Sequence, residues 1–213
     1  MTATVLAIDT STSRGGVAVV DGNGEVLFEE TFVANRSHNS EFVEPLQNAL
    51  NALGDQRLDR VVVGTGPGSY TGIRIGISAA MGVAMSREAA LVGLPSVCAV
   101  AGVESYSVVG DARRGASFVA EIAERKLVGA PRVVDAAEFV RLEGAVFTFD
   151  EKPILEDLPQ VNPEAAILAV IVARMNDGEI EQLAGAPVEP IYLRAPFITE
   201  PKKMGKAVPG APA

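Results

Sequence analysis

The chain begins with three short apolar runs separated by polar turns. The runs cover residues 4–8, 16–20 and 26–32 and are rich in valine, leucine and isoleucine, as is typical of β-strands. The segment Asp21-Gly22-Asn23-Gly24, between the second and third runs, favours a tight hairpin. The pattern therefore predicts an antiparallel meander.

The spacing of the apolar residues then changes from a strand period to a helical one. Four large side chains follow the helical period: Phe42, Leu46, Leu50 and Leu53. They predict a helix over 40–53, and a strand over 58–63 follows it. A glycine-rich loop then leads into a helix over 72–87 and a strand over 90–94. Because helical crossovers join parallel strands, this order predicts a mixed sheet with helices packed on it.

The second half repeats this order more weakly. A strand over 106–110 runs into Asp111, much as the first strand runs into Asp9, and another strand is predicted over 116–122. The repetition predicts a second, smaller lobe built on the same plan.

A strand over 145–149 and a helix bracketed by Asn162 and Gly178 complete the predicted second lobe. The predicted domain organisation is an N-terminal lobe over 1–101, a smaller C-terminal lobe over 102–198 whose segment 190–194 returns to the first, and a disordered tail over 199–213.

The helix predicted over 72–87 is apolar around its whole circumference. One side carries small residues, including Gly72, Gly76 and Gly82, and the other carries large ones such as Met81. An interior glycine costs a helix about 1 kcal/mol relative to alanine, so glycine here indicates close approach of another backbone. A helix without a polar face needs cover on every side. We expect one side to pack on its own sheet and the opposite side to contact another subunit or, alternatively, the second lobe.

Composition limits the range of partners. The 213 residues carry 18 basic and 27 acidic side chains, a net charge of −9 that both halves share. Tight binding to a phosphate backbone depends on clustered Lys and Arg, and their lack here argues against an independent tRNA-binding protein.

The single cysteine, Cys98, lies in an apolar run and can form no internal disulfide. We recognise no signal peptide and no apolar run of roughly 18 residues, and expect a cytoplasmic protein without a membrane partner.

Two segments have the composition of an anion site. The strand-to-helix loop over 64–69 offers backbone N–H groups and a helix N-terminus, and the turn after the first strand offers a carboxylate and hydroxyls. The candidate anion or nucleotide site consists of Asp9, Thr10, Ser11, Gly66 and Gly68. Structural alternatives stay open, because the loop also suits a tight turn and Asp9 also suits a cap of its own turn. No Lys-Ser/Thr pair follows the loop, so it is not a Walker A loop.

The sequence identifies no catalytic residue. His38 is the only histidine, and a zinc site needs more nitrogen or sulfur ligands than His38 and the distant Cys98 supply. The sequence contains the residue types of a Ser-His-Asp triad, so composition alone allows one. The segment Gly66-Pro67-Gly68-Ser69-Tyr70, however, has the wrong register for a Gly-x-Ser-x-Gly elbow. We therefore predict no metal site and no protease activity.

Several of these segments together resemble the TsaB family, also called YeaZ. They are the meander, Asp9-Thr10-Ser11, the block Gly66-Pro67-Gly68-Ser69-Tyr70-Thr71-Gly72-Ile73-Arg74-Ile75-Gly76, and Pro190-Ile191-Tyr192-Leu193-Arg194. The resemblance covers most of residues 3–110 and returns at 190–194. It implies an α/β protein with the actin/hexokinase/Hsp70-like (ASKHA) fold, made of two ribonuclease-H-like lobes with mixed sheets, the second short and degenerate.

The resemblance also implies a function. TsaB is the non-catalytic partner of TsaD, and with TsaE these proteins transfer a threonylcarbamoyl group from its adenylate to N6 of the adenosine beside the tRNA anticodon. The implied partners are a TsaD-type catalytic subunit, a TsaE-type ATPase and, in isolation, a second copy of the chain, while tRNA is reached only through the complex. The resemblance places the contact on the helices at 40–53 and 72–87. The interface residues expected there are Phe42, Leu46, Leu50, Ile73, Arg74, Ile77, Met81 and Met85.

Departures from related proteins account for the missing chemistry. TsaD-like subunits carry two histidines at His-x-x-x-His spacing, whereas His38 stands alone here. Kinases of this fold have a second phosphate loop of the type Asp-Gly-Gly-Thr, and the turn over 111–115 lacks its adjacent glycines and its threonine. The sequence therefore favours a scaffold subunit. A small ATPase or kinase that uses Asp9 and a phosphate at 66–72 is the alternative, and ATP or ADP at the subunit junction or in a cleft stays an open question.

Overall fold

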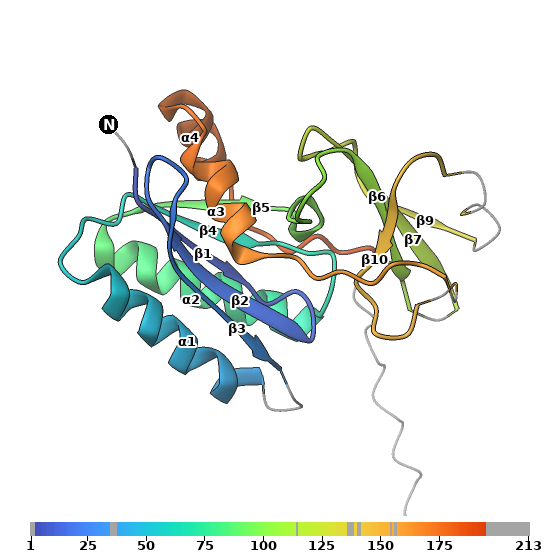
Figure 1. Ribbon diagram of the computed structural model, residues 1–213, viewed down its shortest axis with the longest axis horizontal. Helices are drawn as coiled ribbons and strands as arrows, with labels where there is room; N and C mark the ends of the chain where they lie inside the picture. The colour runs from blue at the N-terminus through green and yellow to red at the C-terminus, as the bar shows by residue number, and fades with distance from the viewer. Residues whose placement is uncertain are drawn as a thin grey trace, which may run out of the picture.

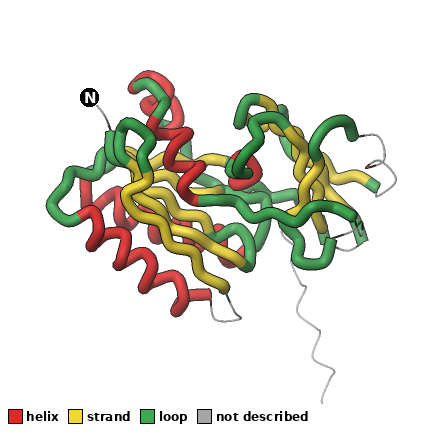
Figure 2. The backbone as a smooth tube through the Cα atoms, viewed as in Figure 1, coloured by secondary structure: helices red, strands yellow, loops and turns green. Residues whose placement is uncertain are grey.

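Two mixed β-sheets organise the fold, and the longer helices gather around the first sheet (Figure 1, Figure 2). The computed structural model describes residues 3–34, 38–113, 115–135, 139, 142–153, 155 and 157–194. The tail predicted over 199–213 lies outside these residues. Among the described residues, no helix is long and apolar enough to cross a bilayer.

The first sheet has the strand order β3-β2-β1-β4-β5. Its strands are β1 (Val5–Asp9), β2 (Arg14–Val20), β3 (Val26–Val33), β4 (Arg60–Gly64) and β5 (Ala90–Leu94). The first three pair antiparallel, which confirms the predicted meander, and β4 and β5 run parallel to β1. Crossover helices make this possible: α1 (His38–Leu53) leads from β3 to β4, and α2 (Tyr70–Arg87) leads from β4 to β5.

Helices cover both faces of the first sheet (Figure 1). Leu6 and Ile8 of β1 pack in the core under α1 and α2, whereas Val5 and Ala7 pack against α3 (Ala165–Ala173) and α4 (Asp177–Ala184) on the other face. All four β1 side chains are fully buried. A strand buried on both faces needs an apolar residue at every position, which explains why β1 forms a continuous apolar run in the sequence.

The second sheet repeats the plan of the first. Its strands are β6 (Tyr106–Asp111), β7 (Ser117–Ala123), β8 (Lys126–Leu127), β9 (Arg132–Val134) and β10 (Val146–Thr148). Strand β6 pairs antiparallel with β7 and parallel with β10, just as β1 pairs with β2 and β4. Asp9 and Asp111 end the two corresponding strands. The predicted internal repeat is therefore present.

The C-terminal helices differ from the prediction. The chain forms α3 and α4 where a single helix was expected between Asn162 and Gly178. Asn176 is the N-cap of α4 and completes a capping box with Glu179, so Gly178 lies inside the first turn of α4 rather than at a helix end. The helix expected between Asn162 and Gly178 is therefore present as α3, but it ends at Ala173, and the prediction missed α4, which the cap at Asn176 starts.

Arg60 anchors this pair of helices to the first sheet. Its guanidinium, almost completely buried, donates to the carbonyl groups of Val172 (2.8 Å) and Met175 (3.0 Å), where α3 ends. It also pairs with Asp177 at 2.9 Å, at the start of α4. A buried cation needs such partners. Residues from the second half thus complete the core of the first lobe, and the domain boundary at residue 101 remains a prediction.

Helix α2 lies against the loop that follows β1. A Cβ atom placed on Gly72 would lie 2.2 Å from the carbonyl oxygen of Thr10, and one on Gly76 would lie 2.3 Å from the Thr10 hydroxyl oxygen. The Thr10 hydroxyl donates to the Gly72 carbonyl group at 2.7 Å. The close approach that these glycines indicate is therefore made to a loop of the same chain. Gly82, by contrast, is exposed and has no atom within 4 Å of a Cβ position.

We predict that Gly72→Ala and Gly82→Ala change stability in opposite directions. The added methyl at residue 72 meets a backbone oxygen that cannot rotate away, so the free energy of unfolding should fall by about 2 kcal/mol. The same change at residue 82 meets open space and should raise that free energy by up to about 1 kcal/mol. Urea unfolding at low protein concentration measures both. Equal effects at the two positions would contradict the described contact.

Candidate functional site

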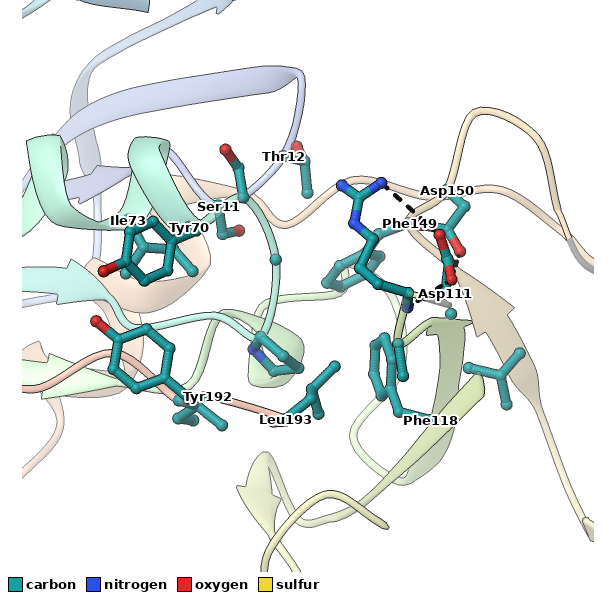
Figure 3. Close-up of a pocket in the computed structure, with 18 of the residues that line it drawn as sticks. Ser11, Thr12, Tyr70, Ile73, Asp111, Phe118, Phe149, Asp150, Tyr192 and Leu193 are labelled. Carbon is teal, nitrogen blue, oxygen red and sulfur yellow. Dashed lines mark hydrogen bonds and ion pairs between the residues drawn. The ribbon is translucent and has the colours of Figure 1, made fainter. Parts of the chain in front are cut away.

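A cleft of about 630 Å³ lies between the two lobes and takes its lining from both (Figure 3). The side chains labelled there are Ser11, Thr12, Tyr70, Ile73, Asp111, Phe118, Phe149, Asp150, Tyr192 and Leu193. The Ser13 hydroxyl donates to Glu151 at 2.6 Å, a contact that joins the lobes at the rim. The cleft is large enough to admit a small molecule or part of a partner.

The predicted anion site is only partly at this cleft. Ser11 and Gly68 line it, but Asp9, Thr10 and Gly66 are not among the lining residues. The Asp9 carboxylate is fully buried and accepts hydrogen bonds from the Ser11 N–H (2.8 Å) and the Ser11 hydroxyl (2.6 Å). The Gly66 N–H donates to the Ser96 hydroxyl oxygen at 3.0 Å. Asp9 therefore caps its own turn, which is the structural alternative that the sequence left open.

Burial dominates the electrostatics of Asp9. It raises the pKa of the carboxyl above its ordinary value of 3.8, and hydrogen bonds from Ser11 and Ser96 lower that pKa by less. The Oδ2 atom has no hydrogen-bond partner of good geometry among the described residues. A Cβ atom on Gly64 would lie 1.8 Å from this oxygen, so only glycine fits at this position of β4.

Two aspartates, Asp111 and Asp150, lie on the opposite wall of the cleft and accept hydrogen bonds from backbone N–H groups. The Asp111 N–H donates to Asp150 at 2.7 Å, and the Arg113 N–H donates to Asp111 at 2.7 Å. Burial raises the pKa of Asp150 above its ordinary value, and the negative charge of Asp111 adds to the rise. The turn that corresponds to a second phosphate loop is thus held by Asp111 and by Asp150 of a later segment, and Arg113, which pairs with Asp111 at 3.7 Å, lines the cleft beside them.

The other candidate residues from the sequence do not assemble into a reactive group. His38 is the first residue of α1, and Cys98 is buried in the short helix Ser96–Cys98. Burial raises the pKa of the Cys98 thiol to about 12, so the thiol stays protonated at neutral pH. Within the described residues, no group of three or more His, Cys, Asp or Glu side chains is placed to hold a metal ion.

A second hollow, of about 560 Å³, lies between α1 and α2. Its lining residues are Phe42, Val43, Tyr70, Thr71, Arg74, Ile75 and Ser78. Large apolar side chains are exposed on the same helices: Val43 is 60% exposed, Met81 47% and Met85 79%. These exposed apolar side chains lie on the two helices where the sequence analysis expected an interface.

The eight interface residues expected from the sequence divide into three groups by their exposure. Phe42, Ile73 and Ile77 are buried in the chain's own core, and their role as contact residues stays a prediction. Leu46 and Leu50 are partly buried against the same core, and Arg74, Met81 and Met85 are exposed.

The helix period explains why the exposure of the large side chains differs along α2. Along α2 the exposed fraction rises from 2% at Ile73 to 7% at Ile77, 47% at Met81 and 79% at Met85. Each step of four residues turns the side chain by about 40° beyond a full turn, so the apolar stripe winds out of the core. Val43 and Tyr70, which the sequence analysis did not select, lie on the exposed side. A helical wheel of α1 places Val43 about 100° from the buried Phe42 and could have identified it.

Comparisons with known proteins agree with one another. The family model for TsaD, described as tRNA N6-adenosine threonylcarbamoyltransferase, matches residues 32–163, more than half of the chain. Uncharacterized protein Rv3421c of Mycobacterium tuberculosis is 32% identical over 205 residues, covering 91% of this chain and 92% of that protein. The Escherichia coli tRNA threonylcarbamoyladenosine biosynthesis protein TsaB is 33% identical over 127 residues, 55% of this chain and 54% of that protein. The TsaB match thus spans about half of each chain.

A solved structure has the same fold. YeaZ from Pseudomonas aeruginosa superposes with a TM-score of 0.66 at 23% sequence identity and covers 90% of this chain and 100% of the other. Together with the two mixed sheets, this match confirms the expected α/β fold of the actin/hexokinase/Hsp70-like class.

We predict that Asp9→Asn raises the free energy of unfolding at pH 7. A carboxyl whose pKa rises on folding stabilises the folded state fully below its unfolded pKa, near 3.8, and this contribution is lost as the pH rises through the folded pKa. An amide carries no charge at either pH and preserves the bonds to Ser11. The advantage of the variant should therefore grow between pH 4 and pH 7 in urea unfolding.

Asp21 provides a matched control with the opposite sign. The backbone N–H groups of Glu25 and Asn23 hold the pKa of this exposed carboxyl below its ordinary value. Its contribution to stability is present above pH 3.8 and is lost as the pH falls through the folded pKa. Asp21→Asn should therefore destabilise at pH 7, by an amount that shrinks in acid. An Asp9→Asn variant that behaved like Asp21→Asn would contradict the conclusion that ionisation of the buried Asp9 carboxyl destabilises the folded state.

Proposed function

Because the chain belongs to the family that the TsaD model describes, and within it to the TsaB/YeaZ group, we propose that it is a non-catalytic subunit in tRNA threonylcarbamoyladenosine biosynthesis. Its role in that assembly is to bind and activate a TsaD-type transferase. Relatives in Escherichia coli and Bacillus subtilis carry the name tRNA threonylcarbamoyladenosine biosynthesis protein TsaB, which supports the process. The exposed apolar face of α1 and α2 is the observation that supports the binding role.

The chemistry of this face suits another protein. Val43, Met81 and Met85 are exposed side chains whose transfer from water stabilises an association by about 1.5–3 kcal/mol each when complete. Ser78 and Gly82 lie beside the methionines on the exposed side of α2, and their small size leaves room for a neighbouring helix to approach. Arg74 lies in the adjoining groove, where it favours a partner carboxylate.

Charge favours a different protein over a second copy as the lasting partner. Each chain carries a net charge of −9, so two copies repel one another at low salt. Methionine side chains adapt to more than one surface, so the same face would accept a second copy when the transferase is absent.

A TsaE-type ATPase is the third component of the proposed assembly. Cytoplasmic location remains a prediction from the sequence.

The non-catalytic part of the proposal rests on the cleft. Asp9, the acid that an ATPase or kinase would use, is buried and caps its own turn. Asp111 and Asp150 occupy the wall where a second phosphate loop would lie. The chain therefore serves the reaction by organising the subunit that performs it.

We predict that Met81→Glu weakens association with the TsaD-type subunit at least tenfold and leaves the fold intact. Loss of the apolar contact exceeds the 1.4 kcal/mol that corresponds to tenfold in affinity, and the added charge would be desolvated. Isothermal titration measures the affinity, and circular dichroism checks the fold. Val128→Glu is the matched control, because Val128 is 54% exposed but lies on the second lobe. Ile77→Glu should instead unfold the chain.

Reconstitution tests the proposed activity. The TsaD-type and TsaE-type subunits with tRNA and the threonylcarbamoyl adenylate should form little modified nucleoside until the chain is added, and Met81→Glu should need about tenfold more protein to restore the rate. The chain alone should not hydrolyse ATP in the presence of magnesium. Sustained ATP turnover by the chain alone, or full modification without it, would overturn the proposal in favour of the ATPase alternative.

A further inference from the structure

We propose that Tyr192, which packs beside Tyr70 at the inter-lobe cleft with Arg74 and Arg194 nearby, is a stacking platform for an unpaired base of tRNA. The proposal rests on the proposed function, which supplies tRNA as the substrate. It adds a direct contact between this subunit and RNA, made when the complex holds the tRNA.

Two exposed aromatic rings from distant parts of the chain meet at this point (Figure 3). The ring centroids of Tyr70 and Tyr192 lie 5.5 Å apart, with 33° between the ring planes. Despite this contact, Tyr70 is 49% exposed and Tyr192 43%. A pair that served only to hold the lobes together would be expected to bury its rings, because burial supplies most of the stabilisation from an aromatic side chain.

Both neighbours of Tyr192 are anchored. The Ile191 N–H donates to the Thr65 carbonyl group at 2.8 Å, and Leu193 packs against the core of the second lobe. The ring is therefore held in place before any ligand binds. A fixed aromatic surface loses little conformational entropy when a base stacks on it, which favours binding.

The ring of Tyr70 already has partners. Arg74 donates to its hydroxyl group, and the guanidinium carbon lies 5.0 Å from the ring centroid. Tyr192 approaches the same ring and keeps 43% of its own surface exposed, which leaves room for a ligand. Alternating arginine and aromatic side chains are how proteins hold unpaired bases, with each base stacked on a ring and the guanidinium near the phosphate.

The distribution of charge around the cleft supports an RNA ligand at this wall. Arg74 and Arg194 lie on the side of Tyr70 and Tyr192, in the groove and cleft linings respectively. Asp111 and Asp150 lie across the cleft, beside Phe118 and away from both tyrosines (Figure 3). Local charge therefore permits a phosphate near the tyrosines although the whole chain is acidic. The far wall carries Arg113 and Lys152 beside the two aspartates, so an ATP titration is needed to separate RNA from a free nucleotide.

The test uses the chain in complex with its TsaD-type subunit and a fluorescent RNA stem-loop with the anticodon sequence and an unmodified adenosine beside it. Tyr192→Ala should weaken RNA binding about tenfold, because stacking of one base contributes an effect of that order. Tyr192→Phe, which keeps the ring, should bind within about twofold of the parent. Arg194→Gln should weaken binding a few-fold and reduce the slope of log affinity against log salt by about one.

Other measurements separate this proposal from the proposed function. Tyr192→Ala should leave the affinity for the TsaD-type subunit unchanged, whereas Met81→Glu should weaken it. If the parent chain failed to bind that subunit, the proposed function would fall, whereas normal subunit binding with unchanged RNA affinity in Tyr192→Ala would overturn the platform alone.

Three results would overturn the platform. The first is unchanged RNA affinity in Tyr192→Ala, and the second is an equal loss in Tyr192→Phe. The third is loss of subunit affinity in Tyr192→Ala without a separate effect on RNA, which would assign the tyrosines to the protein interface. A titration with ATP covers the remaining alternative: Tyr192-dependent binding of ATP with unchanged RNA binding would mean that the cleft holds a free nucleotide.

Discussion

The contact between α2 and the loop after β1 is the constraint on which the other features depend. Gly72 and Gly76 bring the helix backbone against Thr10, whose hydroxyl donates to the Gly72 carbonyl group. The Ser69 N–H extends the contact by donating to the Ser11 carbonyl group at 2.7 Å. Because no side chain fits between the two backbones, the contact fixes both the position of α2 and its rotation about its own axis. One wall of the cleft and the exposed helical face follow from that rotation.

The fixed rotation gives the two ends of α2 different roles. At its N-terminal end the helix buries Ile73 in the core and presents Tyr70 to both the cleft and the groove beside α1. At its C-terminal end the same stripe of large residues faces outward as Met81 and Met85. A single helix thus carries the apolar face assigned to a protein partner and one of the two rings assigned to RNA, which would place those contacts on one rigid element.

Asp9 shows how an acidic residue at a strand end can be structural. Its carboxyl is withdrawn from the cleft and held by Ser11, and burial raises its pKa. Across the cleft, Asp111 and Asp150 engage backbone N–H groups of their own lobe. Acidic groups used in this way cap turns of the chain itself and hold the two walls of the cleft in shape.

The sequence by itself determined the local elements of this protein. The meander, the crossover order and the close approach at Gly72 and Gly76 could all be predicted, because strand periodicity, turn chemistry and the cost of glycine in a helix act over a few residues. The break between α3 and α4 was also local, and the cap at Asn176 was the signal that could have revealed it. The resemblance to a family supplied the fold class, which the comparisons confirmed.

Only the tertiary structure decided which residues are available for function. The sequence cannot show that Arg60 receives α3 from the second half, because that contact depends on how distant segments pack. It likewise does not bring Tyr192 beside Tyr70. The apolar stripe of α2 was visible in the sequence, but which of its members face water depends on the helix rotation. That rotation is set by the shape of the loop after β1, since close packing between backbones admits one arrangement and excludes its neighbours.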